Sequence, residues 1–267
     1  MSGISIFMKK VSFFAALLLL TFSALNVGAE ENITYPIMHP DRETLQKWYN
    51  DYSSAPKTVI NLRISKNLQS SAAPTSIDLL DRIQYTPEER NQGRCGNCWA
   101  WAGTGLIELA LYEDYGIKDR LSVEFQDVCN ELKPNACNGG WLSDLRNFYY
   151  STRYAIPWSN AGGAYTQKEY SAEACAALTK TPRYQFAKVD PATTIPTTGI
   201  TQAQAILNIK NILQQGKGVW FGFYLADNAS WNAFYSFWDD QPEAALWVND
   251  SYCGITTMKI KVAVMPF

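Results

Sequence analysis

The sequence predicts an α+β protein, with helices first and strands late in the chain. Helical periodicity recurs between residues 41 and 216, whereas the aromatic run VWFGFYL at residues 219–225 is typical of a short buried strand. The chain has 267 residues, 47% of them hydrophobic and 18% charged, which suits one large domain or two smaller ones. Its formal net charge of -2 gives no basic surface and argues against a nucleic-acid partner.

The first 29 residues predict a secretory signal peptide that is cleaved after Ala29. Lys9 and Lys10 precede the apolar run VSFFAALLLLTFSAL, and small residues follow at Gly28 and Ala29. The run has about 15 residues, fewer than the ~20 that a helix needs to cross a bilayer. A retained membrane anchor is the alternative. Export would place the chain in an extracellular, periplasmic or lysosome-like compartment, with no membrane span after cleavage.

Residues 30–73 predict a separable N-terminal segment made of one helix and a linker. Asp41 can cap a helix in HPDRETLQKWYNDY, where Leu45, Trp48, Tyr49 and Tyr52 share one face. The stretch SAPKTVINLRISKNLQSSAAPTS then passes through Pro, Ser and Ala and predicts a linker. We expect the globular part to begin near residue 74.

Residues 74–190 predict a helical region. A helix begins at Cys98, runs to about Tyr115 and ends at Gly116; it is apolar over most of its surface, so we expect it to be buried. Ser122 can cap a second helix that reaches Cys129. A tight glycine turn, ACNGGW, leads into a third helix near residues 141–154, and residues 156–170 are typical of a loop.

Residues 191–267 predict a partly β-structured region. Thr201 can cap a helix that Gly216 ends, and the strand at residues 219–225 follows. No internal repeat or low-complexity tract interrupts the chain.

The stretch NQGRCGNCWAW, residues 91–101, carries two of the six cysteines and leaves three interpretations open. A redox pair usually follows a strand, and none is predicted here. A zinc site could use Cys95, Cys98, Cys129 and Cys137, but the spacing between the last two is wide and export disfavours a thiolate cluster. In an oxidising compartment, all of the cysteines could simply form structural disulfides.

The residues around this pair indicate a fourth interpretation. The order of Gln92, Gly93, Cys95, Gly96, Cys98, Trp99 and Ala100 resembles that of papain-like cysteine peptidases, the papain and cathepsin family. Asn97 departs from that pattern, since Ser or Ala is usual there. Downstream, LSVEFQDVC and ACNGGW resemble two further family motifs, with Glu124 where Gln is usual. Upstream, IDLLDR resembles the start of the mature enzyme, which implies that residues 30–73 are a pro-like segment and linker. The resemblance covers roughly residues 74–225.

The resemblance implies a two-lobed fold whose helical lobe is complete and whose β-rich lobe is incomplete. It implies that Cys98 is the nucleophile, which the positive end of its helix would favour as thiolate. It also implies disulfides Cys95–Cys137 and Cys129–Cys175, leaving Cys253 without a partner. No metal or cofactor is implied, and the expected partner of a monomeric chain is a peptide or protein substrate.

The resemblance further implies how substrate would bind. The side-chain amide of Gln92 and the backbone N–H of Cys98 would stabilise the oxyanion. Gly139 and Gly140 would let substrate backbone approach closely, because neither has a Cβ. Trp141 could line a substrate pocket, and core packing is the alternative interpretation of its position.

The resemblance fails at the general base. The family uses a histidine and an asparagine ~130–150 residues after the cysteine, yet the sole histidine here is His39, upstream in the segment MHP. We expect His39 to be a surface or turn residue. Without an imidazole, Cys98 would have no group to stabilise its thiolate or to protonate the leaving amine, so we expect the chain as written to be inactive on peptides.

The final residues suggest a reason for this departure. From about residue 254 the sequence fits neither the preceding loop nor the expected strand. The tail can be back-translated from Gly254 with permitted codons such that restoring one base near residue 255 gives a reading frame that ends in GGGHAV, which resembles the family's catalytic-histidine strand. We therefore expect a single-base deletion, in the genome or in sequencing, to have truncated a peptidase, and we expect the strand at residues 219–225 to keep an unpaired, aggregation-prone edge.

Two other function classes remain open. A non-catalytic peptide-binding protein could keep the peptidase groove without the histidine. A disulfide oxidoreductase could use Cys95 and Cys98, in which case those two sulfurs would be joined to each other.

Overall fold

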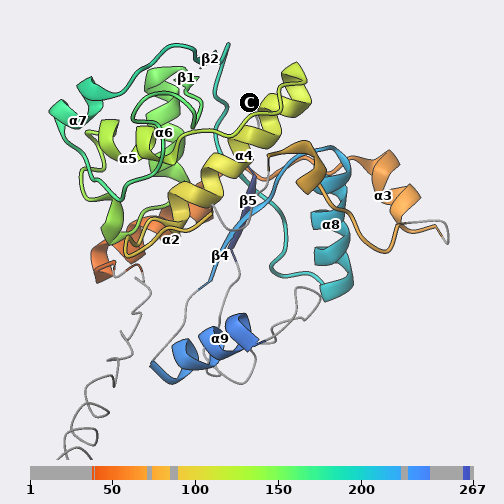
Figure 1. The fold of residues 1–267 in the computed structure, drawn as a ribbon. Helices are drawn as coiled ribbons and strands as arrows, with labels where there is room; N and C mark the ends of the chain where they lie inside the picture. Colours follow the sequence, from red (N-terminus) through yellow and green to blue (C-terminus); the bar gives the residue numbers. More distant parts are fainter. Residues whose placement is uncertain are drawn as a thin grey trace, which may run out of the picture. The chain divides into compact units, whose positions relative to one another are not determined.

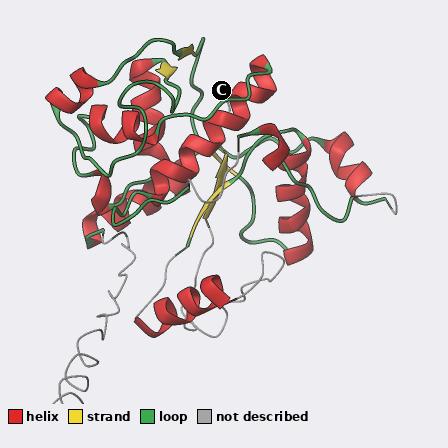
Figure 2. Ribbon diagram, in the orientation of Figure 1, coloured by secondary structure: helices red, strands yellow, loops and turns green. Residues whose placement is uncertain are grey.

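The computed structural model describes residue 38 and residues 40–70, 74–84, 90–223, 228–240 and 261–264. All of them lie in one unit, Pro36–Phe267. Helices dominate and the strands are few and short, which confirms the predicted α+β class (Figures 1 and 2). The helices are α2 (Arg42–Ser54), α3 (Leu62–Leu68), η1 (Leu80–Arg82), α4 (Cys98–Tyr115), α5 (Val123–Cys129), η3 (Ala136–Asn138), α6 (Leu142–Thr152), α7 (Ala172–Ala177), α8 (Gln202–Gln214) and α9 (Asn228–Asp240). The strands are β1 (Tyr154–Ala155), β2 (Tyr184–Gln185), β3 (Thr193–Thr194), β4 (Trp220–Gly222) and β5 (Lys261–Val264).

Helix α4 is the central helix of the described fold. It contacts α5 and α6 on one side and β4 on another, and Figure 1 shows it running between the α5–α7 cluster and the strands. Trp99, Ala100 and Ile107 are all at most 1% exposed, which confirms the predicted burial of this helix. Gly116 ends it in the left-handed conformation, with φ of 68°.

The predicted caps of the neighbouring helices are present. The hydroxyl of Ser122 accepts a hydrogen bond from the N–H of Phe125 at the start of α5. The hydroxyl of Thr201 does the same for Gln204 at the start of α8. Because such caps satisfy backbone groups locally, sequence alone could place these helix starts.

Two small antiparallel sheets complete the structure. In one, β1 pairs with β2, and Tyr154 lies opposite Gln185. The other has the order β3-β5-β4, with Trp220 of β4 opposite Ala263 of β5. The predicted strand at residues 219–225 is therefore present in part, and it has a partner. That partner lies in the tail that we expected to fit no strand, so this expectation was wrong for Lys261–Val264.

The N-terminal segment packs against the rest of the unit through two helices. Asp41 caps α2 as predicted, accepting from the N–H of Thr44 at 2.7 Å, and Trp48 and Tyr52 are buried. The prediction of a plain linker after it was wrong, because residues 62–68 form α3. Asn211 of α8 binds the turn before α3, accepting from the N–H of Asn61 at 3.0 Å and donating to its carbonyl at 2.7 Å.

None of the described helices has both the length and the apolarity needed to cross a bilayer. The predicted signal peptide, residues 1–29, lies outside the described residues.

Candidate functional site

Cys98 is the first residue of α4, and it is exposed and free of any disulfide. Its neighbour Cys95 is 2% exposed and is joined to Cys137, with an S–S distance of 2.04 Å. A second disulfide joins Cys129 to Cys175. The two cysteines of the C-x-x-C stretch therefore have different environments, one structural and one accessible.

These bonds decide between the interpretations that the sequence left open. A Cys95–Cys98 redox pair is excluded in this structure because Cys95 is bonded to Cys137. Within the described part of the chain, no three His, Cys, Asp or Glu side chains gather as a metal site. Cys253 and His39 both lie outside the described residues.

The ionisation of Cys98 differs from our expectation. Burial raises the pKa of its thiol above the ordinary value, and hydrogen bonds from the backbone N–H groups of Trp99 and Cys98 only partly oppose this. The sulfur thus keeps an accessible surface while protein crowds it on other sides. The helix N-terminus favours thiolate, but here it does not outweigh the cost of removing the charged form from water.

Gln92 is the first residue of the loop before Cys98, residues 92–97, which we call the nucleophile loop. Its side-chain Nε2 donates to the backbone carbonyl of Cys95 at 2.8 Å, and its own backbone carbonyl accepts from the hydroxyl of Tyr165 at 3.0 Å. A primary amide carries two N–H groups, so the bond to Cys95 holds the amide in place and leaves the second N–H for another acceptor.

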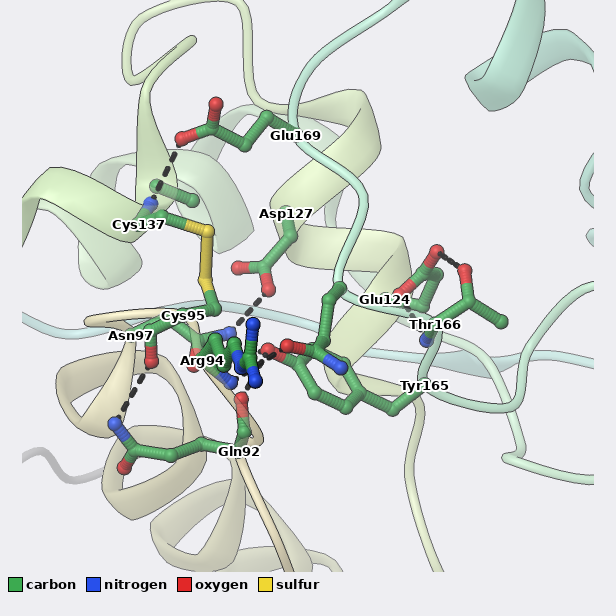
Figure 3. Close-up of a disulfide and its surroundings, with 12 residues drawn as sticks. Gln92, Arg94, Cys95, Asn97, Glu124, Asp127, Cys137, Tyr165, Thr166 and Glu169 are labelled. Carbon is green, nitrogen blue, oxygen red and sulfur yellow. Dashed lines mark hydrogen bonds between the residues drawn. A yellow bond between two sulfur atoms is a disulfide. The ribbon is translucent and has the colours of Figure 1, made fainter. Parts of the chain in front are cut away.

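Asn97, the residue before Cys98, is completely buried, and Figure 3 shows it near Asp127 and Tyr165. Its Nδ2 donates to the carboxyl of Asp127 on α5, and its Oδ1 accepts from the hydroxyl of Tyr165 at 3.2 Å. Although it occupies the N-cap position of α4, its side chain caps no backbone N–H. Within the first turn, the N–H of Ala100 donates to the backbone carbonyl of Asn97 at 2.8 Å, whereas the N–H groups of Cys98 and Trp99 lie beside the Cys98 sulfur.

The two glycines of the ACNGGW turn are each held close to another residue. Gly139 has φ of 94°, and a Cβ there would lie 2.7 Å from the Cβ of Met38. A Cβ on Gly140 would collide with the indole ring of Trp99, whose Nε1 donates to the carbonyl of Ala136 at 3.1 Å. Gly140 is thus required by packing against α4, a reason the sequence did not reveal.

Trp141 lies between two other tryptophans. Its ring stacks on Trp48 of α2 with centroids 5.4 Å apart, and it meets Trp220 of β4 edge-on at 4.6 Å. Its backbone N–H donates to Asp144 at 2.8 Å, at the start of α6. Met38 and Trp48 of the N-terminal segment thus cover the Gly139–Trp141 turn in this structure.

Sequence analysis missed the residues that tie the site together. Asp127 and Tyr165 were not singled out, nor were Gln167 and Glu169, which bind the nucleophile loop and Cys137. One signal was available for Asp127, since this acid follows Phe125 closely and directly precedes the apolar Val128 in a predicted helix. No comparable signal existed for Tyr165, which lies in a stretch predicted only as a loop.

Comparisons with known proteins agree with this geometry. The family model described as "Papain family cysteine protease" matches residues 73–217. A "Probable cysteine protease RD19C" of Arabidopsis thaliana is 30% identical over 107 residues, which are 39% of this chain and 27% of that protein. Ananain of Ananas comosus is 35% identical over 85 residues, 31% of this chain and 23% of its own length. The chain therefore spans about a quarter of these relatives.

A solved structure from work on antibody cross-reactivity between the mite allergens Blo t 1 and Der p 1 shares the fold. Its TM-score is 0.51 at 17% identity, and the match covers 86% of this chain and 64% of that one. At this identity the likeness concerns the fold alone.

Proposed function

Because the chain belongs to the papain family of cysteine proteases, we propose that its site performs acyl transfer with Cys98 as the nucleophile. With a peptide or protein substrate, the thiolate would attack the carbonyl carbon, and a thioester would form only where an acid protonates the leaving amine as the C–N bond breaks. The observation that carries the proposal is the free, exposed Cys98 at the start of α4, beside a Cys95 that is already in a disulfide.

The proposed oxyanion donors are the Nε2 of Gln92 and the backbone N–H of Cys98. Both belong to parts that are held in place, because the Gln92 amide is bonded to the Cys95 carbonyl and Cys98 opens a buried helix. Donors that are fixed before the reaction stabilise developing charge without reorganisation. The Gly139–Trp141 turn is the proposed place for the substrate backbone and for one of its side chains.

We further propose that the 267-residue chain does not cleave peptide bonds. The sole histidine, His39, precedes Cys98, and none follows it. The proposal is that no imidazole protonates the leaving amine. The raised pKa of Cys98 supports this proposal, because the nucleophilic thiolate is then scarce at neutral pH.

Residues 38–70 are proposed to act as a pro-like segment. Met38 lies against Gly139 and Trp48 stacks on Trp141, so the segment occupies the surface that we assign to substrate. Two disulfides support export into an oxidising compartment, which is also part of the proposal.

An activated ester tests the function without needing the missing acid. p-Nitrophenolate leaves without being protonated, so N-acetylphenylalanine p-nitrophenyl ester should acylate Cys98 even in the absence of an imidazole. We expect mass spectrometry to find one acyl group per chain on Cys98 at pH 9, and none there in Cys98→Ala. Gln92→Ala should slow the reaction about 10²-fold, the usual effect of removing an oxyanion donor.

Two controls make the outcome decisive. The corresponding N-acetylphenylalanine amide should remain uncleaved, because its leaving amine must be protonated. The same chain unfolded in urea should acylate slowly and without preference for Cys98 over Cys253. Acylation of Cys98 at an equal rate in folded and unfolded chain would rule out the nucleophile assignment and favour the non-catalytic peptide-binding alternative.

A further inference from the structure

Residues 165–169, which we call the strap, contact the nucleophile loop through Tyr165 and Gln167. The strap is anchored on α5, because the carboxyl of Glu124, 2% exposed, accepts both the backbone N–H of Thr166 at 2.8 Å and its hydroxyl. A buried carboxyl with two such donors holds its partner firmly, since either group would be costly to leave unpaired.

From this anchor the strap reaches the nucleophile loop at several points (Figure 3). The Oε1 of Gln167 accepts from the N–H of Arg94 at 2.6 Å, and the Oε1 of Glu169 accepts from the N–H of Cys137 at 3.0 Å. The strap therefore binds the loop and also the far side of the Cys95–Cys137 disulfide.

Tyr165 makes the contacts that concern the chemistry. Its hydroxyl lies 3.0 Å from the backbone carbonyl of Gln92 and 3.2 Å from the Oδ1 of Asn97. Gln92 carries a proposed oxyanion donor, and Asn97 precedes the residue that carries the other. One phenol thus spans both ends of the loop that supplies these donors.

The orientation of these groups is determined by their partners. Both acceptors at Tyr165 are carbonyl oxygens, so the phenol must donate. The Asn97 amide turns its Nδ2 to Asp127, which leaves its Oδ1 for Tyr165. Burial raises the pKa of Tyr165, and the nearby charge of Asp127 raises it further, so the hydroxyl keeps its proton. The ring itself is fixed edge-on against Trp101 of α4, at 5.0 Å.

We propose that Tyr165 is a positioning residue for the oxyanion hole, which acts by holding the Gln92 backbone at a fixed distance from the start of α4. This inference rests on the proposed function, because it assumes that Cys98 and Gln92 form the reacting site. In the proposed role, Tyr165 contacts neither the substrate nor the Cys98 sulfur. Its hydroxyl fixes the position of the Gln92 amide relative to Cys98.

A small aldehyde separates the positioning role of Tyr165 from the general reactivity of the Cys98 thiol. Cys98 adds to the carbonyl of N-acetylglycinal: an S–C bond forms, the C=O π bond breaks and the thiol proton passes to the oxygen, giving a hemithioacetal. That oxygen occupies the oxyanion position, so its stability depends on the Gln92 and Cys98 donors. Alkylation by iodoacetamide displaces iodide at a saturated carbon, and its rate does not depend on those donors.

The measurement is the dissociation constant of the 13C-labelled adduct by NMR, with the iodoacetamide rate of Cys98 in parallel. Tyr165→Phe should raise the dissociation constant about tenfold, the value of one misplaced hydrogen bond. The alkylation rate should stay within about twofold of that of the unmodified chain. Tyr184→Phe is the matched control: its hydroxyl donates to Asp119 at 2.6 Å, away from the site, and neither quantity should change.

A double-mutant cycle decides whether Tyr165 acts through Gln92. In the Gln92→Ala background, Tyr165→Phe should have no further effect on the dissociation constant. An unchanged constant in Tyr165→Phe, or the same factor with and without Gln92, overturns the positioning role. If the unmodified chain forms no adduct on Cys98 while iodoacetamide labels it, the proposed nucleophilic site itself is wrong, and this inference is lost with it.

Discussion

At the scale of single residues, the loop before Cys98 is held by a buried contact between Asn97 and Asp127, both of which are 0% exposed. The Nδ2 of Asn97 donates to the carboxyl of Asp127, which lies 30 residues away in the sequence. Asn97 was noted only as a departure from the family pattern, because sequence order does not say which buried polar groups meet. The motif around Cys98 did separate a structural Cys95 from a free Cys98, and the structure has Cys95 joined to Cys137.

Asp127 predicts a specific dependence of stability on pH. Burial raises its pKa well above the ordinary value, as do the charges of Glu124 and Glu169, while the hydrogen bond from Asn97 opposes the shift. A carboxyl with a raised folded pKa stabilises the fold below its unfolded pKa of about 4, and this contribution is lost as pH rises towards the folded pKa.

Asp127→Asn removes this titration while keeping an acceptor for Asn97. The free energy of unfolding of the variant, relative to the unmodified chain, should therefore increase from pH 4 to pH 8. Urea unfolding at several pH values measures it. Asp81→Asn, which removes an exposed acid, serves as the control and should show no such trend. A difference between variant and parent that stays constant with pH would mean that Asp127 is ionised in the fold throughout.

At the scale of elements, local signals predicted helices well and their partners poorly. The caps at Asp41, Ser122 and Thr201 lie in the sequence next to the helices they begin, and all three are present. Helix α3 was missed because its surroundings are rich in Ser, Ala and Pro. It is held by Asn211, 150 residues from Asn61, and no local pattern carries that information.

Helix α2 provides a test of the N-terminal segment as a docked element. Trp48 is 5% exposed and stacks on Trp141, so Trp48→Ala should weaken docking by about 3–5 kcal/mol, the usual cost of truncating a buried tryptophan. Limited trypsin digestion should then cleave residues 38–70 much faster than in the parent chain.

Tyr49→Ala is the matched control on the same helix, because Tyr49 is 42% exposed. It should leave the digestion rate close to that of the parent chain. Equal acceleration in both variants would show that the digestion reports the stability of α2 itself, and docking on Trp141 would then contribute little.

At the scale of the whole molecule, sequence predicted the α+β fold class but not the pairing of the strands. The strand at Trp220–Gly222 was expected, yet its partner β5 comes some forty residues later, in a tail that seemed to fit no strand. Pairing over such distances depends on the assembled fold, because residue period alone gives no register between remote strands. Phe221 of β4 remains 59% exposed.

The proposed reaction also depends on remote parts of the chain, because a cysteine nucleophile at the start of α4 needs an imidazole from another element. This chain has no histidine after Cys98, and burial raises the pKa of the thiol. In the function that we propose, Cys98 and its oxyanion donors therefore receive no histidine from the residues that follow them in this sequence.

The rate of Cys98 alkylation as a function of pH tests this account most directly. Iodoacetamide labelling of the 267-residue chain, followed by mass spectrometry of the Cys98 peptide, should show slow reaction at pH 6 and a single rise above the ordinary thiol pKa of about 8.5. Fast, stoichiometric labelling of Cys98 at pH 6 would contradict it, because a thiolate abundant at that pH requires an activating partner that the account says is missing.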